Sequence, residues 1–258
     1  MSRILEELPG QEAEEEQQKL TVLEHLEELR QRLTKAAIGV AIATVVSLLF
    51  TRQLELGPLG TFPGLLLILK YPAGDIELIT IEATEGFSTY FKVAFYSGLA
   101  LATPVILYQA IMFLTPGLTR HERRYIKYLL PGALICFIIG VAFSYYIVLP
   151  PALRFLIPFL SDIATPQIRL GNYISFVTTL LLAVGAVFET PIVIFFLAKL
   201  GIVNHKMLSK NRKFALLGAF VVAAIITPTP DPVTQSLVAG PLLLLYEAGI
   251  WLARIARS

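Results

Sequence analysis

The stretch Leu181–Gly201, LLAVGAVFETPIVIFFLAKLG, carries a single acidic residue, Glu189, within an almost unbroken apolar run. Lys199 marks one end of this run, and Glu189 lies ten residues before it, roughly 15 Å away along a helix. The hydrocarbon core of a bilayer is about 30 Å thick. The stretch therefore predicts a membrane-spanning helix with a carboxyl near the bilayer midplane, where ionisable side chains are rare and are functional candidates by default.

The composition of the whole chain supports a membrane environment. Hydrophobic residues make up 55% of the 258 residues and charged residues only 16%, well below the roughly 25% found in soluble domains. The apolar residues gather in six blocks that are candidate spans: Leu33–Phe50, Thr89–Leu114, Tyr125–Leu149, Asn172–Ala198, Phe214–Ile226 and Val233–Ala253. The sequence thus predicts an all-α integral membrane protein with six transmembrane helices.

These blocks divide the chain into three parts. Residues 1–19 are acidic and polar without an apolar signal-peptide core, and are expected to form a flexible tail. Residues 20–253 are expected to form one six-helix membrane domain, followed by a short tail at 254–258. Thr21 and Glu24 have the spacing of a capping box, which predicts an amphipathic helix that begins there and runs into the first span.

Lysine and arginine are distributed unevenly between the two sides of the predicted membrane domain. If the N-terminus is cytoplasmic, 16 of the 21 Lys and Arg residues fall in the cytoplasmic segments 1–35, 115–127 and 199–213 and in the C-terminal tail. Such residues collect in short cytoplasmic loops and set the orientation of a membrane protein. The asymmetry predicts a multi-pass protein with both termini in the cytoplasm.

The connections on the opposite side have a different character. The segments 51–88 and 150–171 are partly apolar and interrupted by prolines, which predicts short helices in an ordered cap. The fifth apolar block, Phe214–Ile226, would give a helix of roughly 20 Å, shorter than the hydrocarbon core. The bilayer is therefore expected to thin around the last two spans.

Two carboxylates are expected at the cytoplasmic surface. Glu28 lies on the N-terminal helix, and Glu122 lies within the basic run 120–124. Each could accept a guanidinium group in a bidentate pair, which suggests a site for an incoming cationic segment. The alternatives are a purely topogenic basic loop and a helix salt bridge between Glu28 and Arg32, four residues apart, and the sequence does not decide between them.

The intramembrane acid also has more than one interpretation. Glu189 could be a protonated carboxyl bonded to a neighbouring helix, a partner-binding group or an ion-coupling group. Pro191 removes a helix hydrogen bond two residues later and predicts a kink. The sequence has no metal-ligand spacing, phosphate-binding loop or nucleophile elbow, so no cofactor and no enzymatic activity are predicted.

Four stretches carry a resemblance to a known family: HLEELRQRL, ATPVILYQAIMFLTPGLTRHERR, FETPIVIFFLAKLGIV and ITPTPDPVTQSLVAGPLLLLYE. In this order they resemble the TatC family, the multi-spanning receptor subunit of the twin-arginine protein translocase, over about residues 20–251. The resemblance implies a concave, glove-like bundle in the plasma (inner) membrane. It also implies that the protein binds the Arg-Arg signal peptides of folded export substrates, and that transport is driven by the proton-motive force.

The same resemblance implies partners and site residues. The partners are small single-span subunits of the TatA/TatB type and further copies of the chain in a larger complex, with no nucleic acid. The family's signal-peptide site is matched by Glu28, Arg30, Phe113 and Glu122. The positions expected to bind partner helices are matched by Glu189 and Gln235, the latter close to Asp231. In the first outer loop Gly86 stands where proline is common, and no site is assigned there.

One other function class remains open, a proton-coupled small-solute transporter that uses Glu189. Such transporters usually combine several intramembrane polar groups with broken helices and internal repeats. This chain has one deep acid and no evident repeat. The sequence therefore favours a receptor and scaffold for protein export over a transporter.

Overall fold

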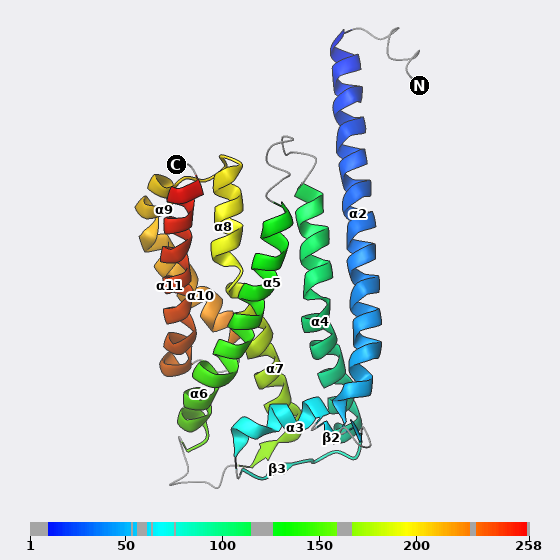
Figure 1. Cartoon of the computed structure of the whole chain (residues 1–258), viewed down its shortest axis with the longest axis vertical. Coiled ribbons are helices and arrows are strands. Elements are labelled where there is room, and N and C mark those ends of the chain that lie inside the picture. The colour runs from blue at the N-terminus through cyan, green and yellow to red at the C-terminus, as the bar shows by residue number, and fades with distance from the viewer. Residues whose placement is uncertain are drawn as a thin grey trace.

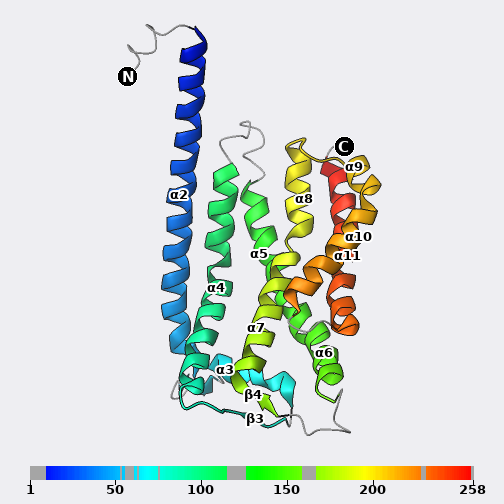
Figure 2. The same ribbon diagram turned by 180° about the vertical axis from the view of Figure 1, so that it is seen from behind.

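The computed structural model describes residues 10–52, 54–55, 61–62, 64–74, 76–114, 126–158, 167–227 and 231–256. They form a mainly α-helical bundle whose helices lie side by side in a shallow layer (Figures 1 and 2). The start of α2 and the end of α11 lie at one end of the bundle, called here the terminal end. The opposite end carries α3 and the short strands and is called the capped end (Figure 1).

The helices follow one another in a simple order along the chain. The longer ones are α2 (Gly10–Thr51), α4 (Glu85–Leu114), α5 (Ile126–Phe143), α6 (Leu149–Leu156), α7 (Leu170–Val187), α8 (Thr190–Lys199), α10 (Arg212–Ile226) and α11 (Pro232–Ala256). The shorter ones are α3 (Gly64–Lys70), the 3₁₀ turn η2 (Tyr71–Ala73) and α9 (His205–Lys210). A π-helical turn, η5 (Ser144–Val148), joins α5 to α6 without a break.

Five of the described helical segments are long and apolar enough to cross a membrane: Leu23–Thr51, Glu85–Phe113, Leu129–Leu156, Leu170–Lys199 and Pro232–Ala256. Helix α10 completes a six-helix count but has only 15 residues. At about 1.5 Å per residue it is roughly 22 Å long, shorter than the hydrocarbon core. Helix α10 is therefore the shortest of these six segments.

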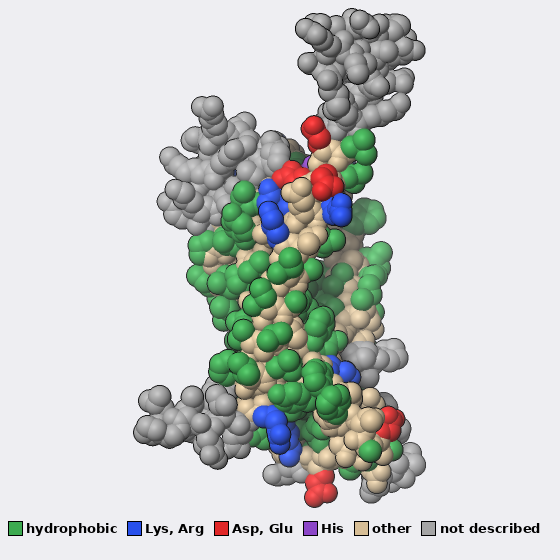
Figure 3. Space-filling view, turned by 90° about the vertical axis from the view of Figure 1, so that its right-hand side faces the viewer, with side chains coloured by type: hydrophobic (Ala, Val, Ile, Leu, Met, Phe, Trp, Pro, Cys, Tyr) green, Lys and Arg blue, Asp and Glu red, His purple; other side chains and the backbone are tan. Residues whose placement is uncertain are grey.

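The surface of α2 matches a lipid environment. Large apolar side chains along its membrane part stay exposed, among them Ile38, Ile42, Val45 and Leu49. Figure 3 shows hydrophobic side chains covering the middle of this face, with charged side chains gathered toward its two ends. A soluble protein rarely exposes so large a continuous apolar surface. This face is therefore one that contacts lipid.

Helix α2 begins earlier than the sequence predicts. It starts at Gly10, within the segment 1–19 expected to be a flexible tail, so Thr21 and Glu24 lie inside the helix and do not cap it. The predicted helix start is wrong. Residues 11–19 are mostly Glu, Gln, Ala and Lys, which are strong helix formers, and extending an existing helix avoids the cost of nucleation.

The fourth predicted span is broken in its middle. Helix α7 ends at Val187, a turn at Phe188–Glu189 follows, and α8 starts at Thr190. Pro191 lies in the first turn of α8. The N–H groups of a first turn have no acceptor within the helix, so the missing N–H of proline removes no helix hydrogen bond there. The kink that Pro191 predicts is confirmed, and it places Glu189 at the break.

Small residues let neighbouring helices approach closely. A Cβ atom at Gly98 of α4 would lie 2.5 Å from the Cα atom of Thr44 on α2. A Cβ atom at Gly140 of α5 would lie 2.9 Å from the Cα atom of Gly185 on α7. Close backbone contact at small residues is a main source of helix association in lipid. These crossings hold α2 against α4 and α5 against α7.

The capped end contains ordered elements that link both outer connections. Strands β1 (Leu54–Glu55) and β2 (Thr61–Phe62) pair antiparallel, and β3 (Leu78–Ile79) pairs parallel with β4 (Ile168–Arg169). The predicted ordered cap is confirmed. Its strands were not predicted, because pairs of two residues are too short to show an alternating pattern.

A buried acid joins this cap to the membrane helices. The Glu85 carboxylate, at the start of α4, accepts hydrogen bonds from the backbone N–H groups of Ile81 at 2.9 Å and Gly171 at 3.0 Å. Arg169 donates to it at 3.3 Å and to Glu82 at 3.0 Å. The two carboxylates raise the pKa of Arg169 above its ordinary value. Glu85 thus fastens the start of α4 to the start of α7.

Candidate functional site

The N-terminal part of α2 and the last turn of α4 meet at the terminal end of the bundle. The His25 ring stacks on the Phe113 ring, with centroids 4.5 Å apart and an interplanar angle of 23°. Helix α2 runs alongside α4 and extends past its end (Figure 1). The stack fixes Phe113, a predicted site residue, against α2.

One turn further along α2, Glu28 takes part in a three-residue polar contact. Arg32 donates to Glu28 Oε1 through Nη2 at 2.6 Å and Nε at 3.0 Å, and its Nη1 lies 3.5 Å from Gln109 Oε1 on α4. The side chains of Arg32 and Glu28 are 19% and 28% exposed, so the pair is sheltered but remains accessible from water. The helix salt bridge that the sequence offered as an alternative for Glu28 is therefore present.

The remaining predicted residues of this site are placed differently. Arg30 projects into solvent, with 80% of its side chain exposed and only a long 3.6 Å contact to Glu27. Glu122 lies outside the described residues. The structure thus brings Glu28 and Phe113 to the same α2–α4 seam but leaves Arg30 on the solvent side.

His25, Arg32 and Gln109 are members of this site that the sequence did not assign to it. On α2, His25, Glu28 and Arg32 are spaced by three and four residues, which places them on one helix face and was the available signal. The contact with α4 joins residues more than seventy positions apart. No local pattern predicts such a contact.

In the middle of the bundle, Glu189 is the acid at the α7–α8 break (Figure 1). Its backbone N–H donates to the Ala186 carbonyl at 3.2 Å, and its carbonyl accepts from Ile192 and Val193, each at 3.0 Å. The side chain is half-buried, and Cys136 of α5 lies within electrostatic range of it. No hydrogen bond to its carboxyl is found within the described part of the chain. The carboxyl is therefore available to a group from another molecule.

Gln235, the second residue predicted to bind partner helices, lies in the first turn of α11. Asp231 caps this helix, since its Oδ1 accepts from the Thr234 N–H at 2.6 Å. Helix α11 begins nearer the capped end, whereas α8 begins in the middle of the bundle (Figure 1). Gln235 and Glu189 are therefore set at different depths in the bundle.

The described residues contain no group of three or more His, Cys, Asp or Glu side chains that could hold a metal ion. Another polar pair at the terminal end, Arg212 of α10 with Glu247 of α11 at 2.8 Å, ties two helices together. The α2–α4 seam, formed by His25, Glu28 and Arg32 of α2 with Gln109 and Phe113 of α4, presents a carboxylate paired with a guanidinium group beside an aromatic ring.

These features define a class: a multi-spanning, all-α membrane protein with a polar and aromatic seam at its terminal end. The family model for "Sec-independent protein translocase protein (TatC)" matches residues 24–241. The chain belongs to the TatC family, and is therefore a component of the twin-arginine protein translocase.

Individual relatives cover almost the whole chain. It is 39% identical to the TatC protein of Carboxydothermus hydrogenoformans, over 94% of this chain and 96% of that protein. It is 42% identical to the TatC protein of Deinococcus radiodurans, over 92% and 86%. A crystal structure of the twin-arginine translocase receptor TatC matches with a TM-score of 0.76 at 39% identity, over 91% of this chain and all of that one.

Proposed function

We propose that the α2–α4 seam, together with Glu122, binds the Arg-Arg pair of signal peptides on folded export substrates. The observation that carries this proposal is the Arg32 guanidinium held by Glu28. A carboxylate that binds an internal guanidinium group in this geometry can bind an incoming one in the same way. The Phe113 ring beside it offers an apolar surface for the residues that follow the arginines.

We also propose that small single-span subunits dock in the membrane at Glu189 and Gln235, and that further copies of the chain join the same complex. The half-buried Glu189 carboxyl, without a described hydrogen-bond partner, supports a role in binding another helix. Hydrogen bonds between helices in lipid are modest in free energy, about 0.6–2 kcal/mol. That strength suits a subunit that binds and leaves during each transport cycle.

The proton-coupled transporter is not favoured. Broken helices with several convergent polar groups are typical of transporter sites. At the α7–α8 break, Glu189 is the one ionisable side chain, and the family to which the chain belongs is a protein translocase.

The proposed location is the plasma (inner) membrane with both termini in the cytoplasm, so that the terminal end faces the cytoplasm. The excess of Lys and Arg there supports this orientation. In a Cys136→Ser background, a cysteine introduced at Lys206 should react with a membrane-impermeant thiol reagent only after the membrane is opened. Labelling of intact cells at position 206 would overturn the orientation.

The binding proposal is tested directly with a peptide. A photo-crosslinkable peptide with Arg-Arg before an apolar stretch should crosslink to the purified full chain, and a matched Lys-Lys peptide should crosslink much less. The reason is that an ammonium group cannot form the two parallel hydrogen bonds of a guanidinium group. Equal crosslinking of both peptides would mean that the site responds to charge alone and does not recognise the arginine pair.

A further inference from the structure

A lateral groove opens on the membrane-facing side of α7, in the half of the bundle nearer the capped end. It has a volume of about 640 Å³. One wall is apolar and comes from α6 and the end of α10, including Leu153, Leu156 and Ile225. Helix α10 ends at Ile226, so between Ile226 and the capped end no α10 residue covers α7. The groove is thus a consequence of the short fifth span.

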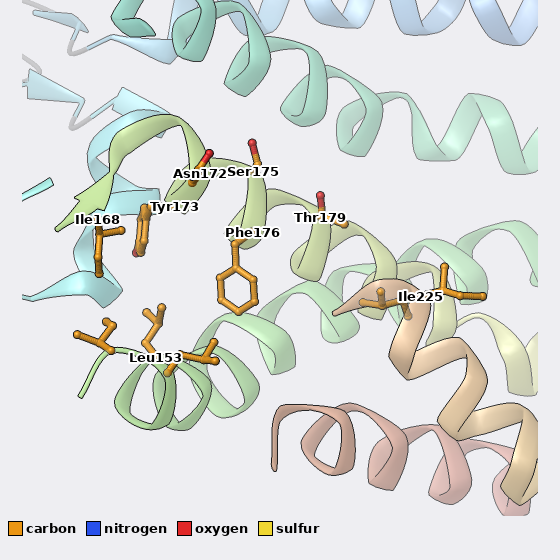
Figure 4. Close-up of a pocket in the computed structure, with 11 residues that line it drawn as sticks. Leu153, Ile168, Asn172, Tyr173, Ser175, Phe176, Thr179 and Ile225 are labelled. Carbon is orange, nitrogen blue, oxygen red and sulfur yellow. The ribbon is translucent and has the colours of Figure 1, made fainter. Parts of the chain in front are cut away.

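The other edge of the groove is polar. Asn172, Ser175 and Thr179 follow one face of α7 and point toward α4, away from the apolar wall (Figure 4). Lys92 of α4 donates from Nζ to Ser175 Oγ at 2.7 Å. The Lys92 ammonium group therefore lies one hydrogen bond from a residue that lines the groove, although Lys92 itself is not part of the lining.

Within the described residues, Lys92 has no acidic partner. The nearest acid along α4 is Glu85, two turns away, and its carboxylate is already bonded to Arg169 and to two backbone N–H groups. An uncompensated cation in a membrane segment is costly unless it reaches an anionic group at the interface. The most available anion at that depth is a lipid phosphate.

We propose that this groove binds an anionic phospholipid from the leaflet at the capped end. Its phosphate lies on Lys92, with Asn172 and Ser175 as further polar contacts, and an acyl chain fills the space against Leu153, Leu156 and Ile225.

The size of the groove favours a lipid over a transmembrane helix. A transmembrane helix is about 30 Å long and would need a groove along most of the bundle. This groove lies only between the end of α10 and the capped end, a length that one acyl chain from the leaflet at that end can fill. The lipid seals the gap left by α10 and supplies the charge that Lys92 lacks.

The test uses the full chain purified in mild detergent with equal amounts of phosphatidylglycerol and phosphatidylethanolamine. Native mass spectrometry then counts the lipids retained. The wild type should prefer phosphatidylglycerol, because the ammonium of phosphatidylethanolamine already compensates its own phosphate. Lys92→Gln should reduce that preference roughly fivefold, the change that about 1 kcal/mol per basic residue produces.

Two variants control for charge and folding. Lys92→Arg should keep the preference, since it keeps the cation. Lys70→Gln removes an exposed cation at the same end of the molecule that does not line the groove, and should leave the preference unchanged. Retention of phosphatidylglycerol by Lys92→Gln at the wild-type level would overturn the proposal. An equal loss of both lipids would do so as well, because phosphate recognition would not be the cause.

A second measurement locates the bound chain. Phosphatidylglycerol with a photoactivatable acyl chain should crosslink to residues of α6 and α7 that line the groove. Ile225→Trp, at a residue that is 78% exposed, should fill the groove and suppress these crosslinks without disturbing the core. Crosslinks confined to the exposed face of α2 would show that lipid binds only around the protein, and would contradict the proposal.

Discussion

Replacing Glu28 by glutamine is expected to weaken binding of an Arg-Arg signal peptide by tenfold or more. An amide keeps the shape of the carboxylate but offers one acceptor oxygen and no charge, so it cannot hold a guanidinium group in a bidentate, charge-assisted pair. Hydrogen bonds to charged groups contribute about 1.5–3 kcal/mol each. Glu122→Gln should be nearly as damaging as Glu122→Ala for the same reason.

Binding can be measured by fluorescence anisotropy of a labelled peptide with the purified protein. Glu24→Gln is the matched control, because it removes the same charge one turn earlier on the exposed part of α2. It should bind the peptide at close to wild-type affinity. If Glu24→Gln and Glu28→Gln lose affinity equally, the peptide responds to the overall charge of α2. If neither variant changes the affinity, the recognition site lies elsewhere.

The Arg32–Glu28 pair also affects how a signal-peptide arginine would bind to Glu28. Because Arg32 occupies Glu28 in the structure, a signal-peptide arginine must exchange with it. The exchange replaces one guanidinium–carboxylate pair by another of the same kind, so it costs little free energy. The internal pair therefore keeps the carboxylate engaged when no substrate is bound without blocking access to it.

Much of the fold could be predicted because each span is a local pattern. The apolar blocks predict the membrane helices, and Pro191 predicts the break at Glu189, since both effects act over a few residues. The start of α2 at Gly10 was missed. The capping motif at Thr21 does not mark the helix start here, because strong helix formers precede it and extend the helix toward the N-terminus.

The site was harder to predict for a related reason. Glu28 and Phe113 could be assigned from motifs, but their neighbours could not. The stack of His25 on Phe113 and the approach of Arg32 to Gln109 depend on how α2 packs along α4. That packing is set by close contacts such as Gly98 against Thr44, far apart in the sequence. A single sequence shows which residues are small, but it does not show which helix they meet.

Glu189→Leu is expected to weaken association with a single-span partner subunit roughly threefold to thirtyfold, whereas Glu189→Gln should preserve most of it. A protonated carboxyl and a carboxamide each offer a donor and an acceptor to a polar group on another helix, and leucine offers neither. One such bond in a membrane is worth about 0.6–2 kcal/mol. Association can be followed by copurification or energy transfer between labelled subunits in nanodiscs.

The same two variants separate hydrogen bonding from proton transfer. Glutamine can hydrogen-bond but cannot release a proton, so partner binding with lost transport in Glu189→Gln would assign a proton-transfer role to the carboxyl. The Leu variant should fold normally, because no described residue bonds to the Glu189 carboxyl and its loss leaves no such residue unpaired. If Glu189→Leu matches the wild type in both partner binding and transport, the acid at the α7–α8 break is only tolerated there, and partner helices dock on a different surface.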